Sequence, residues 1–272
     1  LMGIISPASS PDDLTRIEKG VQYLESLGYK TEVGKNVGKY YGYLAGTNEE
    51  RLEDLHYMFG KKEVKAVICV RGGYGSPRLL PHINFNLIKK NPKIFVGYSD
   101  ITVLHSHLYS NYYISSLHSP MAGAFNEEGY KNEFVLSLKN VLQGKRIKYS
   151  CPAHEFNRKG EAVGELTGGN LALLAHLTGT NSDSKTKGRI LFIEDVGEYS
   201  YNVDRMLHQL KRSGKLSRLA GLIVGGFTDM KDTERPFGKP VYEIIREVIK
   251  EYDYPVCFDF PVSHTDRNYA LK

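Results

Sequence analysis

The chain of 272 residues contains no tryptophan and only three cysteines, at positions 69, 151 and 257. An odd number of widely spaced cysteines argues against a disulfide framework and favours buried thiols in a reducing compartment. Apolar-rich runs such as residues 219–227 are far shorter than the ~20 residues of a membrane span. The N-terminus also lacks a basic region followed by a long apolar stretch. We therefore expect a cytoplasmic protein that does not contact a membrane.

Charge of one sign is not concentrated anywhere in the sequence. Lys and Arg exceed Asp and Glu by 36 − 31 = 5, and the basic residues are scattered. This balance favours solubility and excludes an extended surface for nucleic acid. No spacing typical of metal ligands is present either, so we expect neither a metal nor another cofactor.

Short apolar segments alternate with amphipathic helical patterns along the whole chain, which predicts a parallel sheet covered by helices on both faces. The length suggests two domains. We place the first at residues 1–145 and the second at 161–272, joined by a linker at 146–160 that mixes Lys, Pro and Asn without periodicity. The strands are expected at residues 3–6, 29–33, 64–70, 94–96, 113–117, 161–166, 189–193, 219–224 and 256–260. The helices are expected from Ser10-Pro11 to Gly28 and at 47–59, 101–108, 131–142, 170–177, 203–212 and 241–252.

Ser99 lies at the corner between an apolar strand, residues 94–96, and a helix. Gly97 permits a tight backbone, and Asp100 is a residue type that caps helices. A strand that turns abruptly into a helix exposes the side chain at the corner, as the nucleophile elbow of hydrolases does. Residues 97–101 lack the second glycine of G-x-S-x-G, however, and serine is also a common helix cap. The residues alone leave both roles open for Ser99.

A glycine-rich segment, residues 71–75, follows the third expected strand. Ligands of open α/β sheets bind beyond the carboxyl ends of the strands, and glycines let backbone N–H groups approach them closely. The segment lacks the spacing of nucleotide-binding loops. It is therefore interpreted as a substrate loop or as a plain turn. His118, after the fifth expected strand, is interpreted as a hydrogen-bonded structural histidine in preference to a substrate contact.

Six short motifs, in this order along nearly the whole chain, resemble the LD-carboxypeptidase family. These serine peptidases include the muramoyl-tetrapeptide carboxypeptidases and the microcin C immunity peptidases. The motifs are Ser6-Pro7-Ala8-Ser9, Arg71-Gly72-Gly73-Tyr74-Gly75, Gly97-Tyr98-Ser99-Asp100, Gly168-Gly169-Asn170-Leu171, Ile193-Glu194-Asp195 and Phe260-Pro261-Val262-Ser263-His264.

The resemblance implies an N-terminal parallel α/β domain similar to class I glutamine amidotransferase domains, followed by a smaller mixed α/β domain. Residues 118–121 also match a His-x-Pro-Met signature of the family. Members of the family continue for some tens of residues beyond Lys272, and here Leu1 precedes Met2. We therefore expect a truncated or partly disordered carboxyl end and an unnatural start.

The family's catalytic residues match three positions of this chain. A serine hydroxyl needs a base, usually a histidine held by a carboxylate. The resemblance implies Ser99 as nucleophile, Glu194 as the carboxylate and His264 as the base, in the order that α/β-hydrolases also use. Asp195 and Glu198 are rival carboxylates, and the family pattern selects Glu194. Because Glu194 and His264 belong to the second domain, we expect the active site in the cleft between the domains.

The backbone N–H groups of Asp100 and Gly73 are the candidates for an oxyanion hole, with Gly72 left open as an alternative to Gly73. Arg71 and Tyr98 are the candidate substrate-binding residues. For Arg71, contact with a substrate carboxylate and a salt bridge that holds the glycine loop are equally open.

The reaction that the resemblance implies is metal-free hydrolysis of the bond between the L-centre of a diamino acid and a terminal D-Ala. The implied substrate is a murein tetrapeptide recycled in the cytoplasm, and the implied assembly is a homodimer. One alternative is a microcin C-type immunity peptidase, which cleaves aminoacyl-nucleotide analogues and stacks a base. The chain has no Trp for such stacking, although Tyr or Phe could serve. A non-catalytic binding module is the other alternative, and the presence of all three triad residues argues against it.

Overall fold

The computed structural model describes residues 1–125 and 132–272, which divide into two compact units. Unit 1 consists of residues 1–147 and 269–272, and unit 2 of residues 148–268. The last four residues thus belong to the first unit, whereas the sequence placed them in the second. The reason is hydrogen bonding to residues of unit 1: the Leu271 N–H donates to the His118 carbonyl over 2.7 Å, and the Ala270 N–H donates to Ser137 Oγ over 2.8 Å. Most of the predicted linker, residues 148–160, belongs to unit 2.

Unit 1 is built on a parallel five-stranded sheet with the order β2-β1-β3-β4-β5. Its strands are β1 (Met2–Ile5), β2 (Thr31–Val33), β3 (Ala66–Cys69), β4 (Ile94–Gly97) and β5 (Leu117–His118). The chain proceeds from β1 to one side and then returns to its other side at β3, which makes the carboxyl ends of β1 and β3 the topological switch point. In open α/β sheets this is the place where ligands bind.

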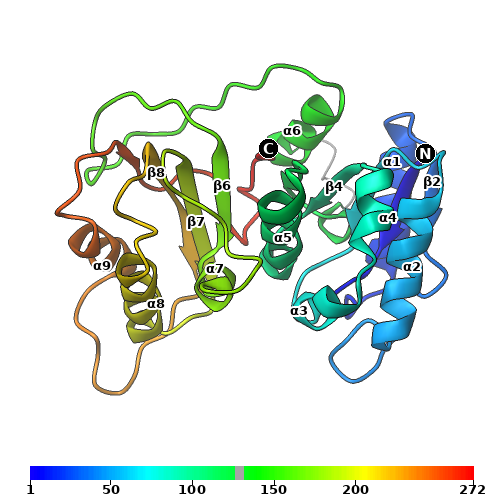
Figure 1. The fold of residues 1–272 in the computed structure, drawn as a ribbon, viewed down its shortest axis with the longest axis horizontal. Helices are drawn as coiled ribbons and strands as arrows, with labels where there is room; N and C mark the ends of the chain where they lie inside the picture. The colour runs from blue at the N-terminus through cyan, green and yellow to red at the C-terminus, as the bar shows by residue number, and fades with distance from the viewer. Residues whose placement is uncertain (126–131) are drawn as a thin grey trace. The chain divides into compact units, whose positions relative to one another are not determined.

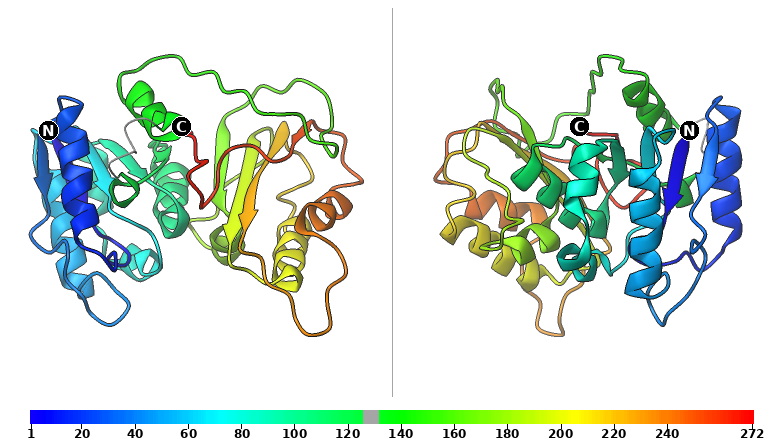
Figure 2. Two further views of the ribbon diagram at one scale, coloured as in Figure 1. Left: turned by 180° about the vertical axis from the view of Figure 1, so that it is seen from behind. Right: turned by 45° about the vertical axis from the view of Figure 1, so that its right-hand side comes forward.

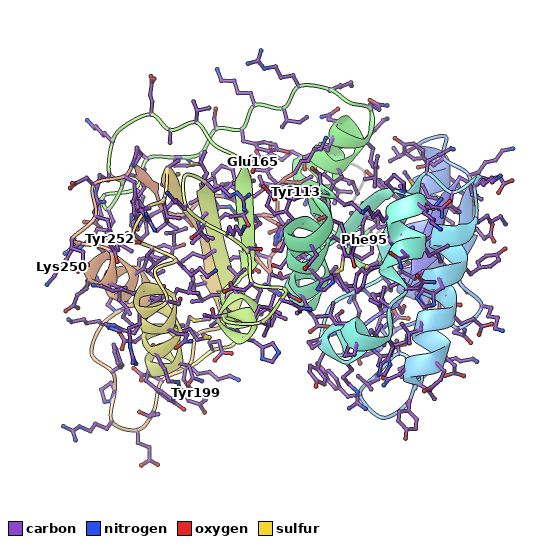
Figure 3. The ribbon with its side chains drawn as sticks, viewed as in Figure 1. Phe95, Tyr113, Glu165, Tyr199, Lys250 and Tyr252 are labelled. Atoms are coloured by element: carbon purple, nitrogen blue, oxygen red, sulfur yellow. The ribbon has the colours of Figure 1, made fainter. Side chains whose placement is uncertain are left out.

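Alternate residues of the buried strands face opposite layers of helices, as the period of two requires. The helices are α1 (Thr15–Ser26), α2 (Asn48–Gly60), α3 (Ser76–Leu79), α4 (Phe85–Lys90), α5 (Thr102–Tyr112) and α6 (Glu133–Leu142), with 3₁₀ turns η1 (Leu80–His82), η2 (Ser99–Ile101) and η3 (Ala122–Ala124). Ile5, Val67 and Phe95 belong to the core beneath α2, α4 and α5, whereas Ile4 and Ile68 belong to the core beneath α1 and α6. Figure 2 shows these two layers, and Figure 3 labels Phe95.

Local signals in unit 1 predicted some boundaries and missed others. The capping box at Thr47 is confirmed, because its Oγ1 accepts from the Glu50 N–H while the Glu50 carboxylate accepts from the Thr47 N–H. The predicted cap at Ser10 is wrong. Asp13 Oδ1 instead accepts from the Thr15 N–H over 2.9 Å at the helix start, and the Ser10 hydroxyl donates to the Lys39 carbonyl.

Two further boundaries of unit 1 differ from the prediction. The fifth strand begins only at Leu117. Tyr113 adopts a left-handed backbone (φ 54°), which ends α5 (Figure 3), and residues 114–116 are irregular. The helix predicted at 131–142 starts at Lys131, which lies outside the described residues, and the structure describes this helix, α6, from Glu133.

Unit 2 contains a parallel four-stranded sheet in the order β6-β7-β8-β9, with its helices packed against the sheet (Figure 1). Its elements are β6 (Leu166–Asn170), α7 (Leu171–Leu177), β7 (Ile190–Val196), α8 (Ser200–Arg212), β8 (Gly221–Thr228), α9 (Val241–Val248) and β9 (Val256–Cys257). The predicted strand at 161–166 is displaced, since β6 starts where the prediction ended. An isolated antiparallel bridge joins Arg158 to Val256. The two units confirm the predicted α/β class.

Within residues 1–125 and 132–272, no helix combines the length and the apolar character of a membrane span.

Candidate active site

Ser99 occupies a strained corner between β4 and α5. Its φ of 62° is left-handed, whereas Tyr98 before it is fully extended, with φ −156° and ψ −173°. For a residue with a Cβ such a conformation costs about 1–3 kcal/mol and persists where the surrounding structure imposes it, often at active sites. The N-caps of η2 and α5 are Tyr98 and Ile101. Ser99 is therefore not a helix cap, and its geometry is that of a nucleophile elbow.

Asp100 does not cap the helix that follows it, as the sequence suggested. Its carboxylate is 3% exposed and accepts from the Ser76 N–H over 2.7 Å, at the start of α3. Burial raises the pKa of Asp100, and the hydrogen bond from Ser76 and the charge of Arg51 oppose that rise. The side chain thus ties the Ser99 corner to the end of the glycine loop, while its backbone N–H stays in the first turn, where a helix has no acceptor of its own for it.

The glycine loop after β3 packs directly against Ser99. A Cβ built on Gly72 would lie 2.8 Å from Ser99 Cβ and 3.0 Å from its Oγ, so a side chain at this position would displace the serine. Gly73 has a φ of 99°, which favours glycine, and it is exposed. The structure therefore brings Gly72 and Asp100 against Ser99, and Gly73 is the next residue of the same loop. The role of the Gly73 and Asp100 N–H groups as oxyanion donors stays a prediction.

Arg71 and Tyr98, the predicted substrate-binding residues, are both half-buried beside this corner. Arg71 Nη1 donates to the Ser10 carbonyl over 3.1 Å. Among the described residues Arg71 forms no salt bridge, so its contact with the chain is a single hydrogen bond to a carbonyl. The Tyr98 ring lies 5.6 Å from the ring of His118, whose backbone pairs with Leu271.

In unit 2 the structure brings Glu194 and His264 together, although they are 70 residues apart in sequence. His264 Nδ1 lies 2.7 Å from Glu194 Oε2, and the Glu194 side chain is completely buried. Burial lowers the pKa of His264, but the charge and hydrogen bond of Glu194, with smaller contributions from Asp195 and Asp229, outweigh that effect and raise it. A histidine held by a carboxylate at Nδ1 has a fixed ring orientation and accepts a proton at Nε2.

Glu194 lies inside β7 and not beyond its end, which corrects the predicted boundary. The pairing of β7 with β8 shifts register between Ile193 and Asp195, and such an irregularity re-aims the side chain at its centre. Two glycines of β8 make room for the chain that carries His264. A Cβ on Gly225 would lie 2.3 Å from the Val262 carbonyl oxygen, and one on Gly226 would lie 2.5 Å from Ser263 Cβ.

The rival carboxylates are engaged elsewhere. Asp195 accepts from Asn170 Nδ2 over 2.8 Å and from two backbone N–H groups, which links β7 to the start of α7. Burial and the charge of Glu194 raise the pKa of Asp195 to about 7. Glu198 accepts from Asn202 Nδ2. Glu194 is thus the carboxylate that the local geometry pairs with His264.

These local arrangements can be compared with known proteins. A model of the LD-carboxypeptidase N-terminal domain matches residues 2–119, and a model of the LD-carboxypeptidase C-terminal domain matches residues 163–272. The chain belongs to the LD-carboxypeptidase family. The predicted enzyme class, a serine-type carboxypeptidase, is confirmed.

Three similar proteins illustrate this family. A probable murein peptide carboxypeptidase of Bacillus subtilis is 39% identical over 276 residues, which cover 99% of this chain and 85% of the relative. The crystal structure of muramoyltetrapeptide carboxypeptidase from Oxalobacter formigenes has a TM-score of 0.83 at 28% identity, covering 99% of this chain and 91% of that one. A structure of MccF in complex with glutamyl sulfamoyl guanosine has a TM-score of 0.87 at 25% identity, covering 99% and 90%.

Several residues around these LD-carboxypeptidase motifs were not assigned a role from the sequence. Ser9 and Arg51 contact the glycine loop of unit 1, and Gly225 and Gly226 accommodate the His264 segment of unit 2. Of these, only the Gly225-Gly226 pair could have been recognised from the sequence, because glycines inside an apolar strand often mark a close approach of another backbone. The other contacts join side chains to distant carbonyls and leave no pattern in the sequence.

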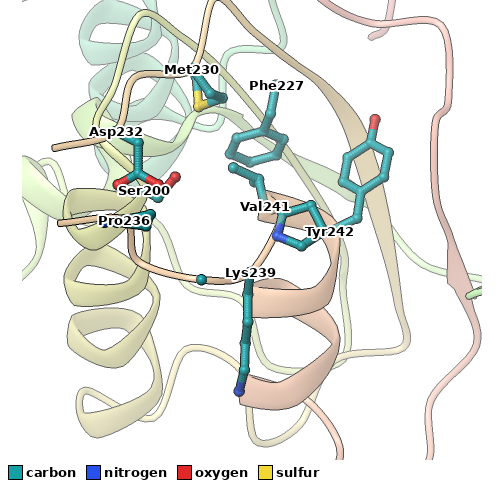
Figure 4. Close-up of a pocket in the computed structure, with 10 residues that line it drawn as sticks. Ser200, Phe227, Met230, Asp232, Pro236, Lys239, Val241 and Tyr242 are labelled. Atoms are coloured by element: carbon teal, nitrogen blue, oxygen red, sulfur yellow. The ribbon is translucent and has the colours of Figure 1, made fainter. Parts of the chain in front are cut away.

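A cavity of about 570 Å³ opens in unit 2 near the end of β8 and the starts of α8 and α9 (Figure 4). Phe227, Met230 and Val241 give it a mainly apolar wall. The Lys239 side chain points away from these residues in Figure 4, and its ammonium group pairs with Glu247. The lining does not include Glu194 or His264, so this cavity is distinct from the candidate catalytic pair.

Proposed function

We propose that this chain is a cytoplasmic LD-carboxypeptidase that removes the terminal D-Ala from murein tetrapeptides, with Ser99 as nucleophile. The left-handed corner at Ser99 carries the proposal, because strained non-glycine residues cluster at active sites and this one presents a hydroxyl beyond the carboxyl end of β4. The murein and muramoyltetrapeptide carboxypeptidases among the similar proteins support the substrate class.

In the proposed mechanism His264 accepts the Ser99 proton at Nε2 as the hydroxyl attacks the carbonyl of the scissile bond. Glu194, bonded to Nδ1, orients the ring and stabilises the imidazolium that forms. The same imidazolium then protonates the leaving amine of D-Ala, and water attacks the acyl-enzyme with His264 again as base. The mechanism requires Ser99 and His264 to act as one unit.

The N–H groups of Asp100 and Gly73 donate to the oxyanion of the tetrahedral intermediate in this proposal. Asp100 directly follows Ser99, and Gly73 directly follows Gly72, the glycine that packs against the serine. A preorganised donor of this kind contributes about 10²–10³-fold to kcat.

Arg71 is the proposed partner of the substrate's terminal carboxylate. Its one hydrogen bond to the Ser10 carbonyl leaves further guanidinium donors for a bidentate contact. The half-buried Tyr98 adjoins Ser99 and completes the proposed substrate contacts.

The microcin C-type immunity activity remains the second candidate, because the MccF structure has a TM-score of 0.87 against 0.83 for the muramoyltetrapeptide carboxypeptidase. We favour the murein substrate because the Bacillus subtilis relative reaches 39% identity, whereas MccF is 25% identical. We also infer a homodimer, which sedimentation analysis would test.

Three peptides and one nucleotide analogue test the proposal. A tetrapeptide stem ending in D-Ala should be cleaved. The same stem with an amidated terminus, or with one further D-Ala, should react at least ~100-fold more slowly, because the half-buried Arg71 then loses its carboxylate partner. Equal rates on the free-acid and amidated stems would rule out a carboxypeptidase of this specificity. Faster cleavage of an aminoacyl sulfamoyl adenosine than of the tetrapeptide would favour the immunity activity.

The catalytic assignments are tested with variants. Ser99→Ala and His264→Ala should each lower kcat roughly 10⁴-fold or more, and the double variant should be no worse than either, since residues that act as one unit have non-additive effects. Glu194→Gln should retain more activity. A tenth of the wild-type kcat in Ser99→Ala would contradict the whole mechanism.

A further inference from the structure

One backbone carbonyl of the glycine loop is held by a single residue from another loop. Ser9 follows β1, is 2% exposed, and donates to the Gly72 carbonyl oxygen twice, from its Oγ over 2.7 Å and from its backbone N–H over 3.2 Å. β1 and β3 are adjacent parallel strands, so the two loops leave the sheet at the same edge. The direction of the Gly72 carbonyl is therefore determined by Ser9.

The direction of that carbonyl also determines the direction of the next amide. A trans peptide is planar and its C=O and N–H are antiparallel, so the Gly73 N–H points away from Ser9. The fit around this peptide is close on both sides. A Cβ on Gly73 would lie 2.1 Å from Ser9 Oγ, and a Cβ on Gly72 would lie 2.8 Å from Ser99 Cβ.

A buried arginine fixes the separation of the two loops. Arg51 of α2 is 2% exposed, and its Nη1 donates to the carbonyl of Pro7 over 2.6 Å and to that of Gly75 over 3.1 Å, one in each loop. Its Nη2 donates to Asn48 Oδ1. A planar guanidinium with this many partners has little freedom to move. Arg51 therefore maintains the distance between the two loops at which Ser9 can bond to Gly72.

We propose that Ser9 is a positioning residue, whose hydroxyl orients the Gly72–Gly73 peptide so that the Gly73 N–H points at the oxyanion formed during attack by Ser99. The inference rests on the proposed function. Ser9 touches no substrate in this scheme and acts only through Gly73, while Arg51 keeps the two loops in register. The donor gains its effect from preorganisation, because a peptide that must rotate during the reaction stabilises the developing charge less.

The test is Ser9→Ala, which removes the hydroxyl contact and keeps the backbone contact to Gly72. We expect kcat to fall about 10–100-fold with KM changed less than about twofold, which is less than the loss of a whole oxyanion donor. The matched control is Thr186→Val. Thr186 lies in unit 2, is 8% exposed, and also donates its hydroxyl to a carbonyl, that of Lys215 over 2.7 Å. This control should keep the wild-type kcat.

A boronic acid analogue of the tetrapeptide separates positioning from a general structural role. It forms a tetrahedral adduct with the serine and places an oxygen where the oxyanion forms. In Ser9→Ala its Ki should rise by the same factor as kcat falls. Affinity for intact tetrapeptide, measured by calorimetry with Ser99→Ala and with the Ser9→Ala/Ser99→Ala double variant, should be unchanged.

Equal kcat values for Ser9→Ala and Thr186→Val would overturn the inference, as would an equal loss of affinity for the boronic acid and the tetrapeptide. Failure of the proposed function has a different signature, namely turnover by Ser99→Ala alone. The two failures are therefore distinguishable.

Discussion

The contact between Gly72 and Ser99 allows one substitution to be worked out in detail. In Gly72→Ala the new Cβ would lie 2.8 Å from Ser99 Cβ, whereas carbon atoms pack at about 3.5–4.0 Å. The difference means that the serine or the loop must move by about 0.7 Å or more. The positive-φ glycines of the chain include Gly73 and Gly75 but not Gly72, so alanine meets no backbone strain there and the clash is the main effect.

We expect Gly72→Ala to fold and to lose about 10²-fold in kcat/KM, because a displacement of about 1 Å at reacting atoms costs that much. The assays are tetrapeptide hydrolysis and the rate at which a fluorophosphonate labels Ser99, and both should fall together. Gly60→Ala is the control. It also lacks a positive φ, and its Cβ would meet only Leu87 Cδ1 at 3.8 Å.

Wild-type labelling and turnover in Gly72→Ala would refute the reasoning, since they would mean that Ser99 does not react from the position described. Loss of folding, seen as a lost circular dichroism signal in Gly72→Ala but not in Gly60→Ala, would instead mean that the glycine loop cannot move far enough to accommodate the new Cβ.

Three other predictions follow from the same structure. The pKa of His264 is raised above its ordinary value of 6.5, and the base must be neutral, so kcat/KM should fall as pH drops below neutrality. Glu194→Gln should move that fall to lower pH. A profile flat from pH 5 to 8 would contradict the assignment of His264 as the base. Maleimide should leave activity intact, because Cys69 is fully buried with its pKa raised well above the usual range, and the half-buried Cys151 and Cys257 adjoin each other and are not among the proposed catalytic residues. Complete inactivation with Ser99 still labelled would move the chemistry to a cysteine. Arg51→Met should destabilise the fold by about 2–5 kcal/mol, because the carbonyls that it bonds lose their donor, and it should also lower kcat. The control Lys93→Met removes a buried ammonium bonded to two other carbonyls, and it should lower stability without lowering the kcat of the folded fraction. Equal kcat losses in the two variants, after correction for the folded fraction measured by urea unfolding, would count against the role of Arg51 in holding the loops.

Local features of the sequence were sufficient to predict the class of fold and some boundaries of its helices and strands. Apolar strands such as 64–70 and 94–96 alternate with amphipathic helices, and burial of both faces of a parallel sheet produces that pattern. The capping box at Thr47 was predictable because both partners lie within one turn. The strand–helix corner at Ser99 was also visible, since Gly97 and the change of period mark it.

Tertiary structure decided the features that depend on distant partners. Ser10 has the sequence context of a helix cap, but the hydroxyl finds the Lys39 carbonyl in a neighbouring loop instead. Asp100 bonds to Ser76, 24 residues away, in place of its own helix. In both cases a longer-range contact replaced the local one that the sequence favoured.

The environment of the candidate site depended most on tertiary structure. The sequence names Ser99, Glu194 and His264 through family motifs, but it contains no sign that Ser9 bonds to a carbonyl 63 residues away. Arginine is usually exposed, so a 2% exposed Arg51 on an amphipathic helix could not be foreseen. Backbone carbonyls are the same at every position, and therefore only the folded chain determines which of them a side chain will bind.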